Sequence, residues 1–113
     1  MRTLNDYFLT TAIPDVSAAS STFVVVPDDG KIIKIFAHNL ATTTGTAAIT
    51  FEINGTACTT AAISHIAASS AGKQYTVNPS ALNNVLEGDV IEAITNGGST
   101  NASKMELTIV IRR

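Results

Sequence analysis

The feature that most constrains the fold is the alternation of apolar and polar side chains in residues 104–112. Met105, Leu107, Ile109 and Ile111 fall on one side of an extended chain, and Lys104, Glu106, Thr108 and Arg112 fall on the other. Successive side chains of a β-strand point to opposite faces of its sheet, so a period of two predicts a strand with one buried face. The segment therefore indicates a small β-sheet domain whose last strand belongs to the core.

A second alternating segment covers residues 47–53 and is followed at once by Asn54-Gly55. This pair suits the two positive-φ positions of a two-residue hairpin turn. The pattern predicts an antiparallel hairpin in which residues 56–63 return along the first strand. That register places Cys58 across from Phe51.

The rest of the chain is divided into short apolar segments by turn residues. We expect strands at 22–26, 31–37, 73–77, 89–95 and 103–112, with Pro27 to Gly30 as a tight turn from which the chain returns. Residues 64–72 are ambiguous, and 78–84 are a connection in which one helical turn is an alternative. Seven or eight short strands without a 3.6-residue stripe predict an all-β fold, an antiparallel β-sandwich with jelly roll as the preferred topology.

Residues 1–20 lack a sustained period and contain small residues and a proline. We interpret them as an extended N-terminal arm, with the sandwich domain at 21–113. The apolar arm residues are the candidate partner-binding positions, anchoring on a sheet or on a neighbouring subunit: Leu4, Tyr7, Phe8, Leu9 and Ile13. A frayed tail and a helical turn over residues 4–9 are the alternatives. On the arm interpretation, deletion of residues 1–20 leaves the sandwich folded.

Composition limits the classes of partner. Charged residues make up 14% of the 113 residues and the net charge is −2, while Thr, Ser and Asn supply most of the polarity. Such a charge-poor surface suits contact with other protein. The seven Lys and Arg are scattered, which argues against a nucleic-acid partner. No apolar run is long enough for a membrane span, and the N-terminal run is interrupted by Asn5 and Asp6, so a cytoplasmic place of synthesis is the simplest expectation.

The residue types that usually carry chemistry are isolated from one another. His38 and His65 lie in different segments without spaced carboxylates, so no metal site is expected. Cys58 is the only cysteine and is expected to act as a small buried hydrophobe. Asp28-Asp29-Gly30 lacks the ligand spacing of a calcium loop, and turn formation explains it better.

Glu87 and Asp89 flank Gly88, and two carboxylates so close in sequence raise a glycosidase interpretation. That chemistry also needs a cleft with side chains that grip the sugar. The chain has no Trp and only two Tyr. We therefore expect no catalytic residue, no cofactor and no enzymatic activity.

The segment Val85-Leu86-Glu87-Gly88-Asp89-Val90-Ile91-Glu92 is followed by a strand, a Gly/Ser/Asn loop and the final amphipathic strand. This order resembles the last third of the small jelly-roll decoration (cement) proteins of tailed bacteriophage capsids. The Ala/Thr/Ser/Asn-rich, tryptophan-free composition is similar to theirs as well. The resemblance implies a structural protein on the virion exterior, present in several copies, often as trimers, which clamps the major capsid protein. It also implies an N-terminal arm that reaches along a neighbouring subunit.

Two other functions fit the same fold. One is a receptor- or glycan-binding module of a fibre or lectin-like kind, which the scarcity of Trp and Tyr disfavours. The other is a small hydrolase built on Glu87 or Asp89, which has less support.

Overall fold

The computed structural model describes residues 5–64 and 71–113, and these residues form ten β-strands. The strands are β1 (Asp6–Ile13), β2 (Ser20–Val25), β3 (Gly30–Asn39), β4 (Ala48–Ile53), β5 (Thr56–Ala57), β6 (Ile63–Ser64), β7 (Gln74–Val77), β8 (Asn84–Val85), β9 (Val90–Thr95) and β10 (Met105–Arg112). No helix in the described part of the chain is long and apolar enough to cross a membrane.

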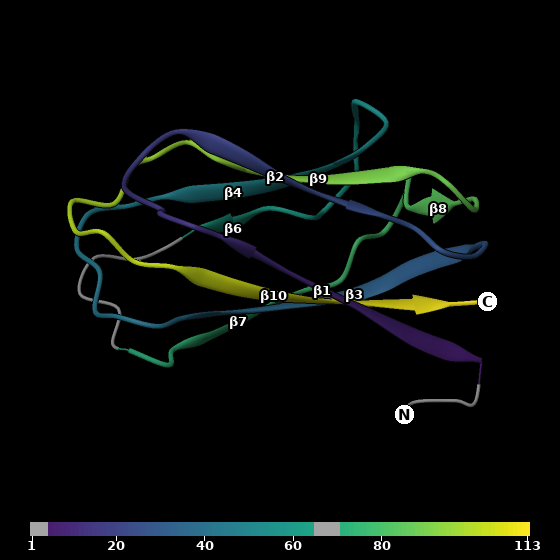
Figure 1. Cartoon of the computed structure of the whole chain (residues 1–113), viewed down its shortest axis with the longest axis horizontal. Helices are drawn as coiled ribbons and strands as arrows, with labels where there is room; N and C mark the ends of the chain where they lie inside the picture. The colour runs from purple at the N-terminus through teal and green to yellow at the C-terminus, as the bar shows by residue number, and fades with distance from the viewer. Residues whose placement is uncertain (1–4, 65–70) are drawn as a thin grey trace.

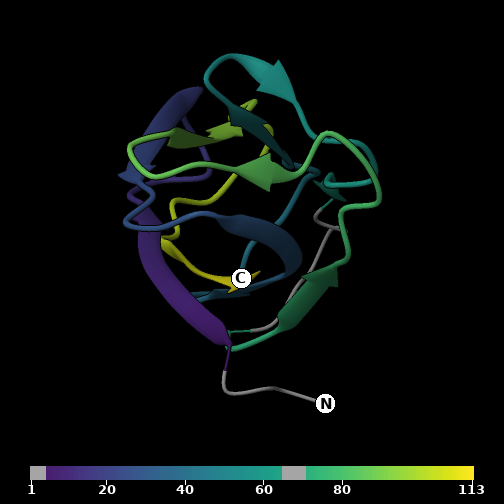
Figure 2. The same ribbon diagram turned by 90° about the vertical axis from the view of Figure 1, so that its right-hand side faces the viewer.

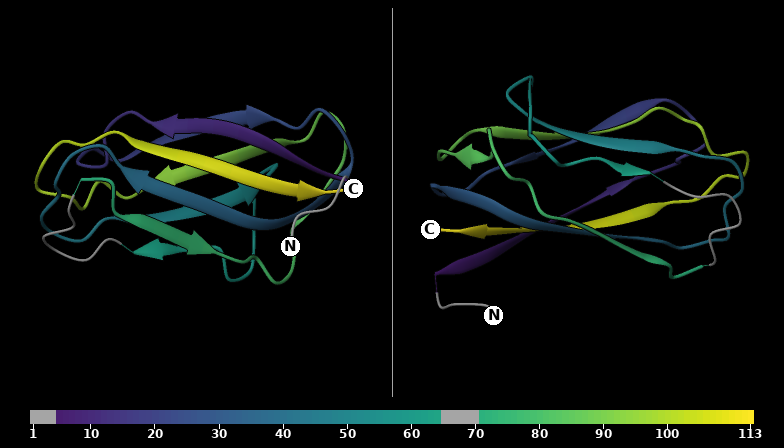
Figure 3. Two further views of the ribbon diagram at one scale, coloured as in Figure 1. Left: turned by 90° about the horizontal axis from the view of Figure 1, so that it is seen from below. Right: turned by 180° about the vertical axis from the view of Figure 1, so that it is seen from behind.

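The strands form two antiparallel sheets packed face to face (Figure 1). One sheet has the order β1-β10-β3-β7, with β8 beside the first residues of β3, and its strands lie side by side in Figure 3. The other has the order β2-β9-β4-β5, with β6 also paired to β4. Strands that follow one another in the chain thus alternate between sheets at both ends of the sequence. This order is that of a jelly roll, so the predicted all-β sandwich is confirmed.

The alternation in the last strand is confirmed, and it explains the position of β10 inside its sheet. Met105, Leu107, Ile109 and Ile111 are each at most 1% exposed and face the opposite sheet. Val110 is also buried, but it is not part of this core cluster, and the register with β3 shifts between Val110 and Ile111. The strand lies between β1 and β3, so its backbone is paired on both edges.

The Asn54-Gly55 turn is confirmed. Both residues have positive φ, at 49° and 85°, and the Cys58 N–H donates to the Phe51 carbonyl at 3.0 Å, as the predicted register requires. The returning strand is shorter than predicted. β5 ends at Ala57, Thr60 has a φ of 59°, and pairing with β4 resumes only at Ile63.

The Pro27–Gly30 turn was predicted to join a strand to its returning neighbour, and that part of the prediction is wrong. β2 pairs with β9 in one sheet and β3 pairs with β10 in the other, so the turn crosses between the sheets. Gly30 permits this crossing, because a Cβ at this position would lie 2.5 Å from the Ile111 side chain. Alternation within single strands could not distinguish a hairpin from a crossover.

The extended N-terminal arm is not confirmed. Residues 6–13 form β1 and pair with β10 along its whole length, from Asp6 opposite Arg112 to Ile13 opposite Met105. Ile13 and Val16 are buried in the core. The lack of sustained alternation concealed this strand, because the apolar Phe8 points outward and the polar Thr11 lies opposite the buried Leu107. The Thr11 hydroxyl of β1 and the Thr22 hydroxyl of β2 are 3.3 Å apart, and Figure 2 shows these two strands along the same side of the sandwich.

Two further predictions concern connections. Residues 78–83 contain no helical turn, and Leu82 within them has a φ of 54°. The ambiguous segment 64–72 falls mainly on residues 65–70, which lie outside the described residues.

Candidate functional site

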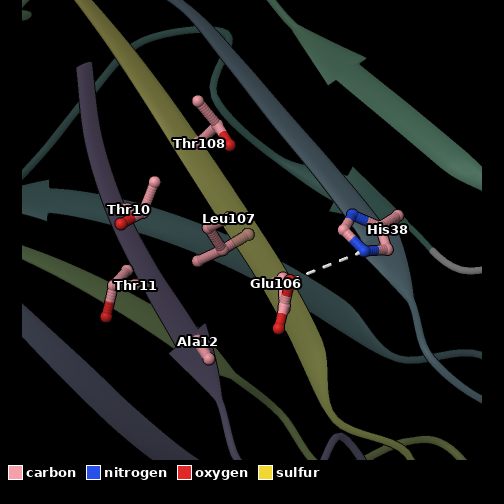
Figure 4. A pocket seen from close by; sticks show the side chains of 7 residues that line it. All are labelled: Thr10, Thr11, Ala12, His38, Glu106, Leu107 and Thr108. Atoms are coloured by element: carbon pink, nitrogen blue, oxygen red, sulfur yellow. Dashed lines mark ion pairs between the residues drawn. The ribbon is translucent and has the colours of Figure 1, made fainter.

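The outer face of the β1-β10-β3 sheet carries a shallow depression of about 420 Å³ (Figure 4). Its lining residues come from these three strands: Thr10, Thr11, Ala12, His38, Glu106, Leu107 and Thr108. The His38 Nε2 and a Glu106 carboxylate oxygen are 3.7 Å apart, and the two side chains are about half exposed. The lining offers hydroxyls and one ion pair but no aromatic ring, so it lacks the stacking surface on which sugar rings usually rest.

The histidines do not assemble a metal centre in the described part of the chain. His38 faces Glu106 alone, and His65 lies outside the described residues. No group of three or more His, Cys, Asp or Glu that could hold a metal ion occurs among the residues that the structure describes. The expectation of no bound metal stays a prediction.

Cys58 is half-buried and packs against the core, where sequence analysis expected it. Burial raises the pKa of its thiol, and the nearby negative charge of Glu52 raises it further. Both effects disfavour the thiolate, which is the nucleophilic form. The environment is therefore that of a packing residue.

Asp28 and Asp29 serve the turn in which they lie. Asp28 accepts a hydrogen bond from Arg113 Nε at 2.6 Å, and this bond lowers the pKa of its carboxyl group. Its backbone carbonyl accepts a bond from the Tyr7 hydroxyl, and the Arg113 guanidinium lies 4.9 Å from the Tyr7 ring centroid. Asp29 accepts from the backbone N–H of Glu87. These contacts fasten the β2–β3 turn to β1, to the residue that follows β10 and to the β8–β9 turn.

Glu87 and Asp89 lie at the β8–β9 turn, where hydrogen bonds hold Asp89 in place. The Asp89 carboxylate accepts the Leu86 N–H and the Asn54 side-chain amide, each at 2.9 Å, and these bonds lower the pKa of Asp89. It thereby joins the β8–β9 turn to the β4–β5 turn. Glu87 is exposed, and neither carboxylate lines the depression described above.

The candidate partner-binding residues of the N-terminal segment lie on two different faces. Ile13 is buried, and Tyr7 and Leu9 pack against the core. Phe8 points outward and is 55% exposed. Leu4 lies outside the described residues. Of the four described candidates, Phe8 alone presents most of its side chain to a partner.

The outer face of the β2-β9-β4 sheet is apolar and acidic, and we call it the acidic face. Its outward-pointing residues are Ser21, Phe23, Val25, Ala48, Thr50, Glu52, Val90, Glu92 and Ile94. Phe23 and Val25 are each 61% exposed. Glu92 lies between Phe23 and Glu52 in the strand register. A large apolar side chain exposed on a sheet face beside charged residues is typical of an interaction surface.

Sequence analysis missed the acidic face. Residues 22–26 are almost uniformly apolar, so they give no alternation that separates inward from outward positions. Glu52 and Glu92 are 40 positions apart, and their contact depends on the pairing of β4 with β9. The available signal was the absence of Lys and Arg from all three strands of this face.

No protein-family model and no curated protein matches the sequence. Solved structures do resemble the fold. A chain in the acidic stable capsid structure of Helicobacter pylori bacteriophage KHP30 has a TM-score of 0.61 at 11% identity, with 96% of this chain and 87% of that chain covered. The Agl-KA catalytic domain has a TM-score of 0.53 at 10% identity, and the match covers 90% of this chain but 21% of that one. A carbohydrate-binding module of Cellvibrio mixtus lichenase 5A has a TM-score of 0.47 at 17% identity, covering 99% and 90%. At these identities the similarity establishes the fold, an antiparallel β-sandwich shared with a phage capsid chain.

Proposed function

We propose that this chain is a non-enzymatic structural protein of a bacteriophage virion, which decorates the outside of the capsid and stabilises it. In this role it contacts the major capsid protein and further copies of itself, as a trimer on the pattern of the resembling family. It is made in the host cytoplasm and needs no cofactor.

The observation that carries the proposal is the similarity to a chain of a phage capsid structure over nearly the full length of both chains. The match covers 87% of the capsid chain, so nearly all of that chain has the same fold. The match to Agl-KA covers only 21% of that chain, so the fold forms one part of a larger enzyme there. Fold alone does not determine function, so the site must agree as well.

The described surface supports adhesion better than catalysis. Phe8, Phe23 and Val25 each expose more than half of their side chains. Outward apolar groups on both sheets favour contact with protein surfaces. The described carboxylates with lowered pKa are held in turns by hydrogen bonds, and this accounts for their shifts without a substrate.

The test is binding of the purified protein to capsids of the phage that encodes it, assembled without this protein. We expect co-sedimentation with the capsids, saturation at a fixed number of copies, and a capsid that resists heat better when decorated. Purified protein that stays in the supernatant at every concentration would contradict the proposal.

The second candidate is a receptor- or glycan-binding module, and the depression with His38 and Glu106 is the observation in its favour. Thr hydroxyls and a carboxylate can hydrogen-bond to sugar hydroxyls, although the lining lacks an aromatic ring. A glycan array separates the two functions. Specific binding that Glu106→Ala abolishes would favour this candidate over capsid decoration.

A further inference from the structure

We propose that the acidic face is the surface that docks on the capsid lattice, and that its partner is a protein surface presenting Lys or Arg beside apolar side chains. This inference rests on the proposed function and adds to it the face, the chemistry of the partner and the residues that recognise it.

Glu52 and Glu92 are directly opposite each other on β4 and β9. Residues opposite each other in an antiparallel pair have Cβ atoms about 4.5–5.5 Å apart, and like charges at that separation destabilise the sheet. Among the residues that the structure describes, neither carboxylate has a salt-bridge or hydrogen-bond partner. Folding alone therefore gains nothing from this pair, whereas a Lys or Arg supplied by a partner would offset the repulsion between the two carboxylates.

The sheet itself provides no such cation. The strands β2, β9, β4, β5 and β6 contain no Lys or Arg. Lys31, Lys34 and Arg112 lie on β3 and β10 of the other sheet. The charge of the acidic face is thus uncompensated over its whole width. Complementary charge across an interface guides the encounter and fixes its register, so the partner must be basic at the position facing the two carboxylates.

The apolar residues of the face supply the remaining affinity. Phe23 is next to Glu92 in the register, and Val25 is next to Val90. Both edge-strand side chains are 61% exposed, while Val90 and Ile94 are partly exposed beside them. Aromatic side chains that fill a pocket of the partner are common among the residues that dominate binding energy. The partner surface must therefore offer an apolar depression beside its basic group.

The test measures the affinity of the full chain for capsids that lack it, using wild type and E52K/E92K. The double reversal keeps a like-charge pair at the same two positions, so we expect the melting temperature of the free protein to be unchanged. Binding should weaken at least about tenfold, because like-charge contacts at an interface cost several kcal/mol. E52Q/E92Q should also bind more weakly, although it removes the repulsion within the sheet. The matched control is E87K, which changes the net charge by two units, as E52Q/E92Q does, at an exposed turn position and should bind as wild type does.

The outcomes separate the two proposals. If wild type binds and E52K/E92K binds equally well, the acidic face is not the docking surface, while capsid decoration stands. If E52K/E92K instead changes the mass of the free protein in solution, the face joins copies of this chain and the inference is overturned. If wild type fails to bind capsids, both proposals are overturned. Weaker binding of E52K/E92K and of E52Q/E92Q, together with normal binding of E87K, would support the inference.

Discussion

Two phenylalanines illustrate how the same residue type serves different purposes on the two faces of one sheet. Phe51 on β4 is 1% exposed and is the largest fully buried side chain, whereas Phe23 on β2 is 61% exposed. Phe51→Ala should lower the free energy of unfolding by about 3–5 kcal/mol, because it removes buried apolar surface and leaves a cavity. Phe23→Ala should change it by no more than about 0.5 kcal/mol. Urea unfolding of both variants checks this pair, and equal losses would contradict the assignment of the faces.

Three aspartates predict how stability depends on pH. Hydrogen bonds from Ser17, from Arg113 and from Leu86 with Asn54 lower the pKa of Asp15, Asp28 and Asp89, respectively, below the ordinary 3.8. The folded chain therefore binds fewer protons than the unfolded chain in this range, and stability rises with pH. Their contribution is fully present above 3.8 and is lost as the pH falls through the lower folded pKa values.

Asp89→Ala tests this dependence at one position. The wild type should be more stable than the variant near pH 6, and the difference should shrink as the pH falls below 3.8 and through the lower pKa of folded Asp89. Unfolding curves recorded across this range provide the measurement. A difference that stays constant with pH would show that the carboxylate charge makes no contribution.

At the level of single elements, a turn or strand could be predicted from the sequence wherever nearby residues determine the backbone conformation. Asn54-Gly55 specified its turn because both positions need positive φ. The last strand was readable because its burial alternates without interruption from Met105 to Ile109. β1 was not readable, because its pairing with β10 depends on residues about 100 positions away. Pairing of that kind is a property of the fold and leaves little trace in local periodicity.

Two glycines provide a matched prediction about turns. Gly55 has a φ of 85° and open space around its Cβ position, so Gly55→Ala should cost only the left-handed backbone conformation, about 1–2 kcal/mol. A Cβ on Gly98 would lie 1.9 Å from the Thr46 carbonyl oxygen, so Gly98→Ala must displace the backbone and should cost more. Thermal unfolding ranks the two variants. A smaller loss for Gly98→Ala would contradict the close approach of these loops.

Removal of the N-terminal strand should have a large effect on folding. Deletion of residues 1–13 removes β1, uncovers one edge of β10 and takes Ile13 out of the core. We expect the truncated chain to lose cooperative unfolding or to aggregate through the exposed edge. Phe8→Ser, an outward substitution on the same strand, should leave the fold intact. A truncated chain that melts cooperatively near the wild-type temperature would restore the interpretation of this segment as an arm.

On the scale of the whole molecule, the sequence predicted the sandwich because short strands, turn residues and the absence of a helical period all agree. It did not predict how the strands are shared between sheets, since alternation is the same for a hairpin and for a crossover such as Val25 to Gly30. For the candidate site, too, local features could be predicted from the sequence, and features that depend on strand pairing could not. The sequence indicated correctly that Cys58 packs against the core, whereas the pairing of Glu52 with Glu92 required the completed fold.

We propose above that this jelly roll lies on the outside of a phage capsid, and this position can be tested directly. The most direct measurement is a cryo-electron microscopy reconstruction of capsids assembled without the protein and then mixed with it. We predict additional density on the outer surface that fits the two-sheet sandwich, with the strands β2, β9 and β4 facing the lattice. A reconstruction identical to that of the undecorated capsid, at saturating protein concentration, would contradict the claim.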